Sequence, residues 1–168
     1  MQIKHNSNDY LPQISDRYTI DRNKIALGSG KKVFEQAKIA LCQWKMFDFD
    51  WVELFSPETS IKPGLTVGIV VHQFGIWSIN LCRVVDFIEE EDQAIKKFGF
   101  AYGTLTSHGL SGEERFLIDW NQENNLVHYD LFAFSRPNQY LTKIGYWYVR
   151  QIQKRFANAS LQAMKIEK

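Results

Sequence analysis

The residues with the most chemical potential lie in one stretch, Lys97 to Trp120. Tyr102 and Thr104 carry hydroxyl groups, Glu114 carries a carboxyl group, and His108 carries an imidazole that titrates near neutral pH. A carboxyl or imidazole group beside hydroxyl groups can bind a polar ligand atom or transfer a proton as a general acid or base. This stretch is therefore the first candidate for a functional site.

The alternation of residue types around these groups predicts a β-hairpin. One face of the first strand holds Phe98, Phe100, Tyr102 and Thr104. One face of the second strand holds Glu114, Phe116, Ile118 and Trp120. The segment between them, residues 106–112, has the Gly, Ser and His composition of a loop. We expect both faces to point into a core, which brings the polar groups together at one end of the hairpin beside His108.

Each of these polar residues has a structural interpretation beside the functional one. Tyr102 and Thr104 either orient a ligand or bond to the backbone as ordinary core residues. His108 contacts a ligand, acts as a base, or stabilises its turn. Glu114 is expected to face inward, where desolvation raises its pKa unless an Arg or Tyr pairs with it.

Three further polar residues lie in or just after the next predicted strand. Arg136 either binds an anionic ligand, forms a salt bridge with Glu114, or ties the strand to the helix that follows. His128 and Asp130 either face inward as an imidazole–carboxylate pair or face outward and leave Tyr129 inside. The outward orientation is the interpretation we adopt, with the inward one left open.

Composition and charge exclude several classes of protein. The net charge is +1, from 20 basic and 19 acidic residues, which argues against a large nucleic-acid surface. No stretch approaches the roughly 20 apolar residues of a membrane span, and the first residues lack the apolar region of a secretory signal. Cys42 and Cys82 have no metal or redox spacing, so two buried free thiols and a cytoplasmic location are expected. The four His residues are far apart in sequence and no cofactor motif occurs, so neither a metal nor a cofactor is expected.

The order of the predicted elements indicates an α+β fold. Residues 1–16 are predicted to be a flexible arm, and residues 17–168 a single domain. Strands are predicted at 18–27 (interrupted near 21–23), 51–55, 65–73, 77–89, 95–105, 113–121 and 126–135, and a helix at 31–44. Because strands and helices are segregated along the chain, the sheet is expected to be antiparallel.

A long amphipathic helix is predicted from Pro137 to about Met164. Its apolar stripe comprises Leu141, Gly145, Tyr148, Ile152, Phe156, Ala159 and Ala163. Its basic residues, Lys143, Arg150 and Lys154, are expected to face solvent. A strongly curved sheet can wrap such a helix and leave an apolar cavity, and the small residues Gly99, Ala101 and Gly103 permit that curvature.

Several segments resemble one family of uncharacterised proteins, DUF1990 or UPF0548. They are LGSGKKVFEQAKIALCQWKMF at 27–47, the hairpin FGFAYGTL…H…GEERF at 98–116, YDLFAFSRP at 129–137 and YVRQIQKRFANASLQAM at 148–164. That family is similar to the Bet v 1/START-like (SRPBCC) superfamily, so the resemblance implies a helix-grip fold. Many members of that superfamily hold apolar or amphipathic small molecules, and some are enzymes.

The leading hypothesis is therefore a protein that binds a hydrophobic or amphipathic small molecule between the sheet and the last helix. The expected ligand-binding residues are Phe100, Tyr102, Thr104, His108, Glu114, Phe116, Arg136 and Tyr148. One alternative is an enzyme that uses Glu114 or His108 for proton transfer in the same cavity. Another is a protein-interaction module that uses the basic face of the helix. The sequence indicates neither the ligand nor the oligomeric state.

Overall fold

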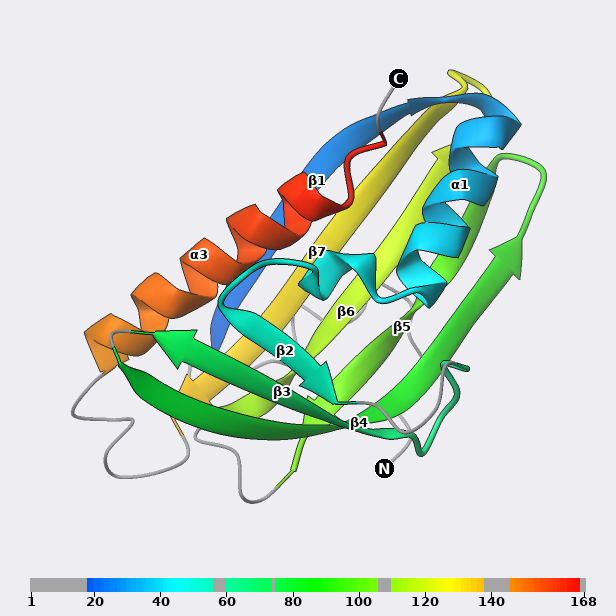
Figure 1. Cartoon of the computed structure of the whole chain (residues 1–168). Helices are drawn as coiled ribbons and strands as arrows, with labels where there is room; N and C mark the ends of the chain where they lie inside the picture. The colour runs from blue at the N-terminus through cyan, green and yellow to red at the C-terminus, as the bar shows by residue number, and fades with distance from the viewer. Residues whose placement is uncertain (1–17, 56–59, 74, 106–109, 138–145, 167–168) are drawn as a thin grey trace.

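The computed structural model describes residues 18–55, 60–73, 75–105, 110–137 and 146–166, which form a curved sheet with helices on its concave side (Figure 1). The predicted arm, residues 1–16, lies outside the described residues, and its separation from a single domain stays a proposal. In chain order the elements are β1 (Thr19–Ser29), α1 (Gly30–Cys42), the short 3-10 helix η1 (Lys45–Phe47), β2 (Val52–Phe55), β3 (Thr66–Gln73), β4 (Ile76–Glu91), β5 (Ile95–Thr104), β6 (Leu110–Asn121), β7 (Leu126–Pro137) and α3 (Tyr146–Ala163).

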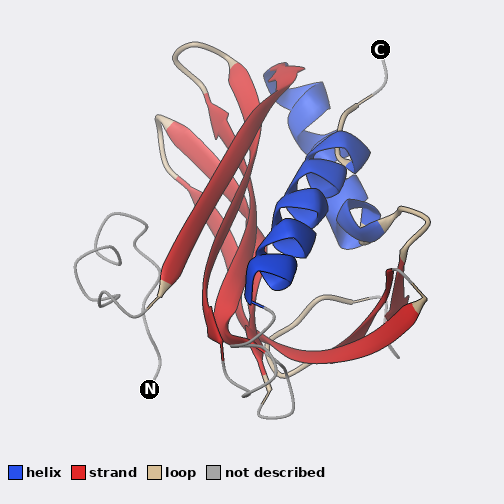
Figure 2. Cartoon of the chain, turned by 90° about the vertical axis from the view of Figure 1, so that its left-hand side faces the viewer, coloured by secondary structure: helices blue, strands red, loops and turns tan. Residues whose placement is uncertain are grey.

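The described strands form one seven-stranded antiparallel sheet in the order β1-β7-β6-β5-β4-β3-β2. Consecutive strands are neighbours except that β1 pairs with β7. Figure 2 shows both helices on the concave side and the β2–β3–β4 end curving beneath α3. The α+β helix-grip architecture expected from the sequence is therefore confirmed.

Three predicted boundaries are wrong, each for a local reason. β1 is continuous through residues 21–23, because every residue from Thr19 to Ala26 pairs with β7. The first helix ends at Cys42, before Trp44, whose φ of 59° is left-handed. Pro137 ends β7 opposite Leu110 and does not open the last helix, since a proline is tolerated at the end of a strand. Leu141, Lys143 and Gly145 lie outside the described residues.

One half of the concave face is closed by α1 and η1. Phe34, Ala37 and Leu41 of α1 are buried, as are Met46 and Phe47 of η1. The Phe47 ring lies 5.6 Å from the Phe116 ring, and the Trp44 ring lies 5.1 Å from the Phe100 ring. These aromatic contacts fill the space above the centre of β5 and β6, so this half of the face is a packed core.

The second half of the concave face is spanned by α3, which packs against η1, β1 and β7. Its C-terminal half is buried through Ala157, Leu161 and, just past its end, Met164. Ser160 is also buried, and its hydroxyl lies 2.9 Å from the Tyr129 hydroxyl of β7. This hydrogen bond satisfies two polar groups that would otherwise be costly in the core.

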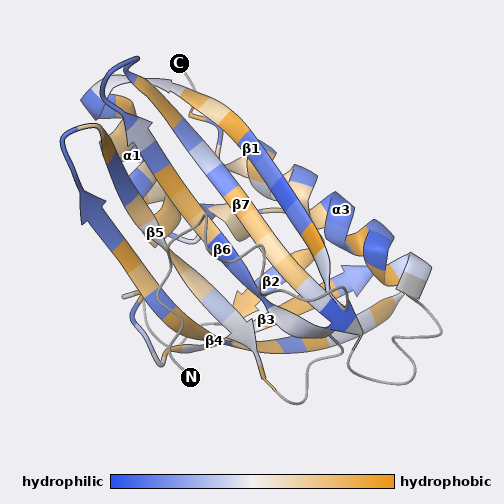
Figure 3. Cartoon of the chain, turned by 180° about the vertical axis from the view of Figure 1, so that it is seen from behind, coloured by the Kyte–Doolittle hydropathy of each residue, from blue (hydrophilic) through white to orange (hydrophobic). Residues whose placement is uncertain are grey.

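Figure 3 shows the outer, convex face of the sheet, on which β1 and β7 lie side by side. His128 and Asp130 face outward and Tyr129 faces inward, as in the interpretation adopted from the sequence. Asp130 is not an ordinary surface residue, however, because it is only 1% exposed. Its carboxylate accepts hydrogen bonds from Arg22 at 2.8 Å and from the buried Arg115 at 3.4 Å. A buried carboxylate needs such cationic partners.

The outer face of the β2–β3–β4 end exposes a second, apolar region. We call Phe55, Trp77 and Leu81 the outer patch; their side chains are 60%, 59% and 37% exposed. Trp77 stacks on His72 with ring centroids 4.2 Å apart. No helix among the described residues is long and apolar enough to span a membrane.

Gly99 permits the close approach of β5 to β6, so we predict that Gly99→Ala is strongly destabilising. A Cβ at this position would lie 2.2 Å from the Phe116 carbonyl oxygen, which is backbone and cannot move aside cheaply. We expect Gly99→Ala to lower the free energy of unfolding by about 2–3 kcal/mol, measured by urea denaturation. The matched control is Gly103→Ala on the same strand, whose Cβ would lie 3.5 Å from Val85, an ordinary contact. Equal losses in the two variants would contradict this account of the sheet.

Candidate functional site

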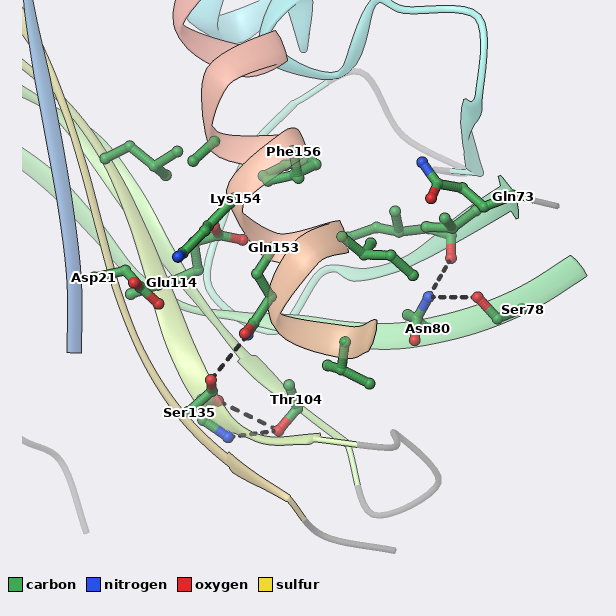
Figure 4. Close-up of a pocket in the computed structure, with 18 of the residues that line it drawn as sticks. Asp21, Gln73, Ser78, Asn80, Thr104, Glu114, Ser135, Gln153, Lys154 and Phe156 are labelled. Atoms are coloured by element: carbon green, nitrogen blue, oxygen red, sulfur yellow. Dashed lines mark hydrogen bonds between the residues drawn. The ribbon is translucent and has the colours of Figure 1, made fainter. Parts of the chain in front are cut away.

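A cavity of about 740 Å³ lies between α3 and the sheet, on the side of the β2–β3–β4 end (Figure 4). Its apolar wall includes Ile69 and Val71 of β3, Leu131 of β7, and Tyr148, Ile152 and Phe156 of α3. Its polar groups include Asp21 of β1, Asn80 of β4, Tyr102 and Thr104 of β5, Glu114 of β6 and Gln153 of α3. The cavity exists because α3 contacts β1 and β7 and so lies away from β3 and β4.

Tyr102 and Glu114 form a hydrogen-bonded pair in this cavity. They are paired across β5 and β6, which places their side chains side by side on the inner face. The Tyr102 hydroxyl donates to Glu114 Oε2 at 2.5 Å. The pair therefore combines a carboxyl and a phenol at the boundary between the packed core and the cavity.

Burial perturbs the titration of both partners. Desolvation raises the pKa of the Glu114 carboxyl to about 7, although the hydrogen bond from Tyr102 acts in the opposite direction. The negative charge of Asp21 raises this pKa further. The pKa of Tyr102 is raised well above its usual value by desolvation and by the Glu114 charge. At neutral pH Tyr102 is a hydrogen-bond donor, and Glu114 exchanges readily between its two protonation states.

Thr104 shows the structural role that the sequence left open. The Gly112 N–H donates to Thr104 Oγ1 at 3.0 Å, and the Thr104 hydroxyl lies 3.3 Å from the Gly112 carbonyl oxygen. Thr104 lines the cavity, but its hydroxyl is engaged in joining β5 to β6. It is therefore part of the wall and not a free polar group.

A polar seam holds the first turns of α3 to β1 and β7. Arg150 donates two hydrogen bonds to the Asp21 carboxylate, at 2.5 and 2.6 Å. Arg150 also donates to Gln153 at 2.7 Å, and Gln153 in turn donates to Ser135 at 2.9 Å. A two-pronged arginine–carboxylate pair fixes orientation as well as distance. Arg150 was expected to face solvent and instead lies at this seam.

The eight predicted site residues fall into four groups. Tyr102, Thr104, Glu114 and Tyr148 line the cavity. Phe100 and Phe116 are inward but belong to the packed core, because Trp44 and Phe47 occupy the space above them. Arg136 is exposed on the opposite face of the sheet and lies over the Tyr18 ring, 5.0 Å from its centroid, so it does not pair with Glu114. His108 lies outside the described residues.

The sequence analysis predicted neither the polar seam nor the cavity wall that β3 forms. Asp21 falls in the predicted interruption of the first strand, although the alternation of Asp21, Asn23 and Ile25 along β1 contains the signal for one inner face. Ile69, Val71 and Gln73 of β3 also alternate, but nothing in the sequence reveals that they face α3 across an open space. Among the described residues, no group of three or more His, Cys, Asp or Glu side chains could hold a metal ion.

Comparison with known proteins identifies relatives over almost the whole chain. The family model DUF1990, a domain of unknown function, matches residues 4–163. A UPF0548 protein from Dictyostelium discoideum is 39% identical over 155 residues, in a match that covers 88% of this chain and 71% of that protein.

Solved structures with the same fold are much more distant in sequence. Ara h 8.0201 matches with a TM-score of 0.52 and 9% identity, over 88% of this chain and 97% of that chain. The Zhui aromatase/cyclase from Streptomyces sp. R1128 matches with a TM-score of 0.52 and 14% identity, over 88% of this chain and 91% of that chain. These matches establish the Bet v 1-like fold and nothing about activity.

The raised pKa of Glu114 predicts how stability depends on pH. Because the folded state holds this proton more tightly than the unfolded chain, stability falls as the pH rises from about 4.5 to about 7. Glu114→Gln removes this loss, so at pH 8 we expect the variant to be more stable than the wild type by about 3 kcal/mol. At pH 4 the two proteins are expected to be equally stable. Urea denaturation between pH 4 and pH 8 measures the difference, and parallel pH profiles would contradict the assignment.

Proposed function

We propose that this chain, which belongs to the DUF1990 (UPF0548) family, binds a hydrophobic or amphipathic small molecule in the cavity between α3 and the sheet. The observation that carries the proposal is the cavity itself. Its volume of about 740 Å³ falls within the range of roughly 300–1,000 Å³ typical of small-molecule sites. A helix packed evenly on the sheet would leave no such space.

The lining supports the same conclusion. Aliphatic and aromatic side chains from β3, β7 and α3 form most of the wall, while the Tyr102–Glu114 pair is a localised polar feature. Small-molecule sites combine apolar walls with a few polar groups that fix orientation. Cys82 is a buried free thiol as expected, whereas the free thiol of Cys42 is exposed and not buried. Free thiols suit a reducing compartment, so we propose a cytoplasmic location.

Filling the cavity tests this function. Ala133 lies on the inner face of β7 between Asp21 and Glu114, and it lines the cavity. We expect the wild type to bind the neutral fluorescent probe N-phenyl-1-naphthylamine, and Ala133→Phe to weaken that binding at least about tenfold. The control is Gln36→Phe, which adds the same ring to an exposed position of α1. Absence of probe binding by the wild type, or equal binding by both folded variants, would contradict the proposal.

A second candidate is an enzyme in which Glu114 transfers a proton to or from the bound molecule. The observation in its favour is a carboxyl group with a pKa of about 7 that borders an apolar cavity. A general base works best when its pKa lies near the working pH. The interaction module based on the basic face of α3 loses support, because Arg150 is held by Asp21.

A model reaction tests this second candidate. Opening of 5-nitrobenzisoxazole needs one base that removes the ring C–H proton while the N–O bond breaks to give a cyanophenolate. If Glu114 is such a base, the wild type should accelerate this reaction with an apparent pKa of about 7. The acceleration should be lost in Glu114→Gln and kept in Glu90→Gln, an exposed carboxyl on the β4–β5 hairpin. Equal rates in all three proteins would remove the enzyme candidate.

A further inference from the structure

We propose that the ligand of this cavity is an amphipathic amine whose protonated nitrogen pairs with Glu114. This inference rests on the proposed binding function and adds the chemical class of the ligand. It starts from the incomplete pairing of the Glu114 carboxyl group.

Among the described residues, Glu114 has a single hydrogen-bond partner, the Tyr102 hydroxyl, and it forms no ion pair. That bond engages Oε2, and among the described residues no hydrogen bond engages Oε1 of this half-buried, cavity-lining residue. Carboxylates inside proteins are usually paired with a cation or with several hydrogen-bond donors. Asp130 illustrates the usual arrangement in this same sheet, with Arg22 and Arg115 around it. Glu114 lacks an equivalent cation.

The groups around Glu114 do not supply that cation. They come from every element packed against it, namely Cys82 of β4, Tyr102 of β5, Tyr129 of β7, Asp21 of β1, and Arg150 and Lys154 of α3. Cys82 and Tyr129 are neutral at pH 7, since burial raises the pKa of both. Arg150 is held by Asp21. The exposed Lys154 extends from α3 toward the side of the cavity that holds Asp21 and Glu114 (Figure 4), but among the described residues it forms no ion pair with either carboxyl group. Among the described residues, therefore, no cation is bound to the Glu114 carboxyl group itself.

An amine with an apolar tail complements this arrangement. Its ammonium group would face Glu114 Oε1, and its tail would lie along Ile69, Ile152 and Phe156. An anionic ligand would instead meet repulsion from the ionised Glu114 carboxylate, whereas the charge of Asp21 is already balanced by Arg150. The distribution of charge in the cavity thus distinguishes ligands that have equal apolar surface.

The inference also predicts how the affinity for the amine changes with pH. An ammonium group pairs with the ionised carboxylate, so binding of the amine releases the proton that Glu114 holds at lower pH. With a Glu114 pKa of about 7, the ionised fraction rises about tenfold between pH 6 and pH 8, and the affinity should rise by about the same factor. A ligand that accepts a hydrogen bond from the protonated carboxyl would show the opposite trend.

The test uses three ligands with the same eight-carbon tail: octylamine, 1-octanol and octanoate. Each is titrated against bound N-phenyl-1-naphthylamine with the full chain at pH 6 and pH 8. We expect octylamine to displace the probe at a concentration at least about tenfold lower than 1-octanol at pH 8, with octanoate the weakest. The affinity for octylamine should rise about tenfold between pH 6 and pH 8.

Variants separate the role of Glu114 from the general affinity of the cavity. Glu114→Gln should weaken the binding of octylamine at least about tenfold and remove its pH dependence, while the affinity for 1-octanol stays within about twofold of the wild-type value. Glu90→Gln, which removes an exposed carboxyl group elsewhere, should change the affinity for neither ligand. If octylamine equals 1-octanol in the wild type, or is unaffected by Glu114→Gln, the amine inference is wrong and the proposed binding function stands. If the probe does not bind, the proposed function fails and the inference fails with it.

Discussion

The structure depends on how α3 is attached to the sheet, which is wider than the helix. Two polar contacts tie α3 to one side of the sheet: the Arg150–Asp21 ion pair at its first turns and the buried Ser160–Tyr129 hydrogen bond near its end. Both partners on the sheet belong to β1 or β7, which are adjacent. Because the helix is fixed along these two strands, it cannot also cover β3 and β4 at the other end of the sheet. The open space is a consequence of this one-sided attachment.

The concave face is consequently divided into two parts with different physical properties. Beneath α1 and η1, aromatic rings such as Phe47 and Phe116 are in contact and belong to the packed core. Beneath the first turns of α3, the inner face of the sheet is largely apolar, and a cavity of about 740 Å³ lies between it and the helix. Tyr102 and Glu114 lie where the two parts meet, so the carboxyl group is desolvated by the core and still reaches the cavity. This position explains both its raised pKa and its unused oxygen atom.

The sequence predicted the parts of this arrangement that depend on local periodicity. The alternation along β5 and β6 placed Tyr102 and Glu114 on one inner face, and the pairing of these strands confirms it. The sequence did not distinguish Phe100 and Phe116, which are packed, from Tyr148, which lines the cavity, because all three are inward aromatic residues. That difference arises from Trp44 and Phe47, whose left-handed turn and 3-10 helix depend on tertiary contacts. Arg136 was misplaced for a simpler reason, since alternation along β7 with Tyr129 inward puts residue 136 on the outer face.

The central claim is that the space beneath α3, and not the outer patch, receives an apolar molecule. Intermolecular nuclear Overhauser effects between bound N-phenyl-1-naphthylamine and the methyl-labelled protein test it most directly. The account predicts contacts from the probe to the methyl groups of Val71, Ala133 and Ile152, which line the cavity. Contacts confined to the Leu81 methyl groups and the Trp77 ring, on the exposed outer face, would contradict it.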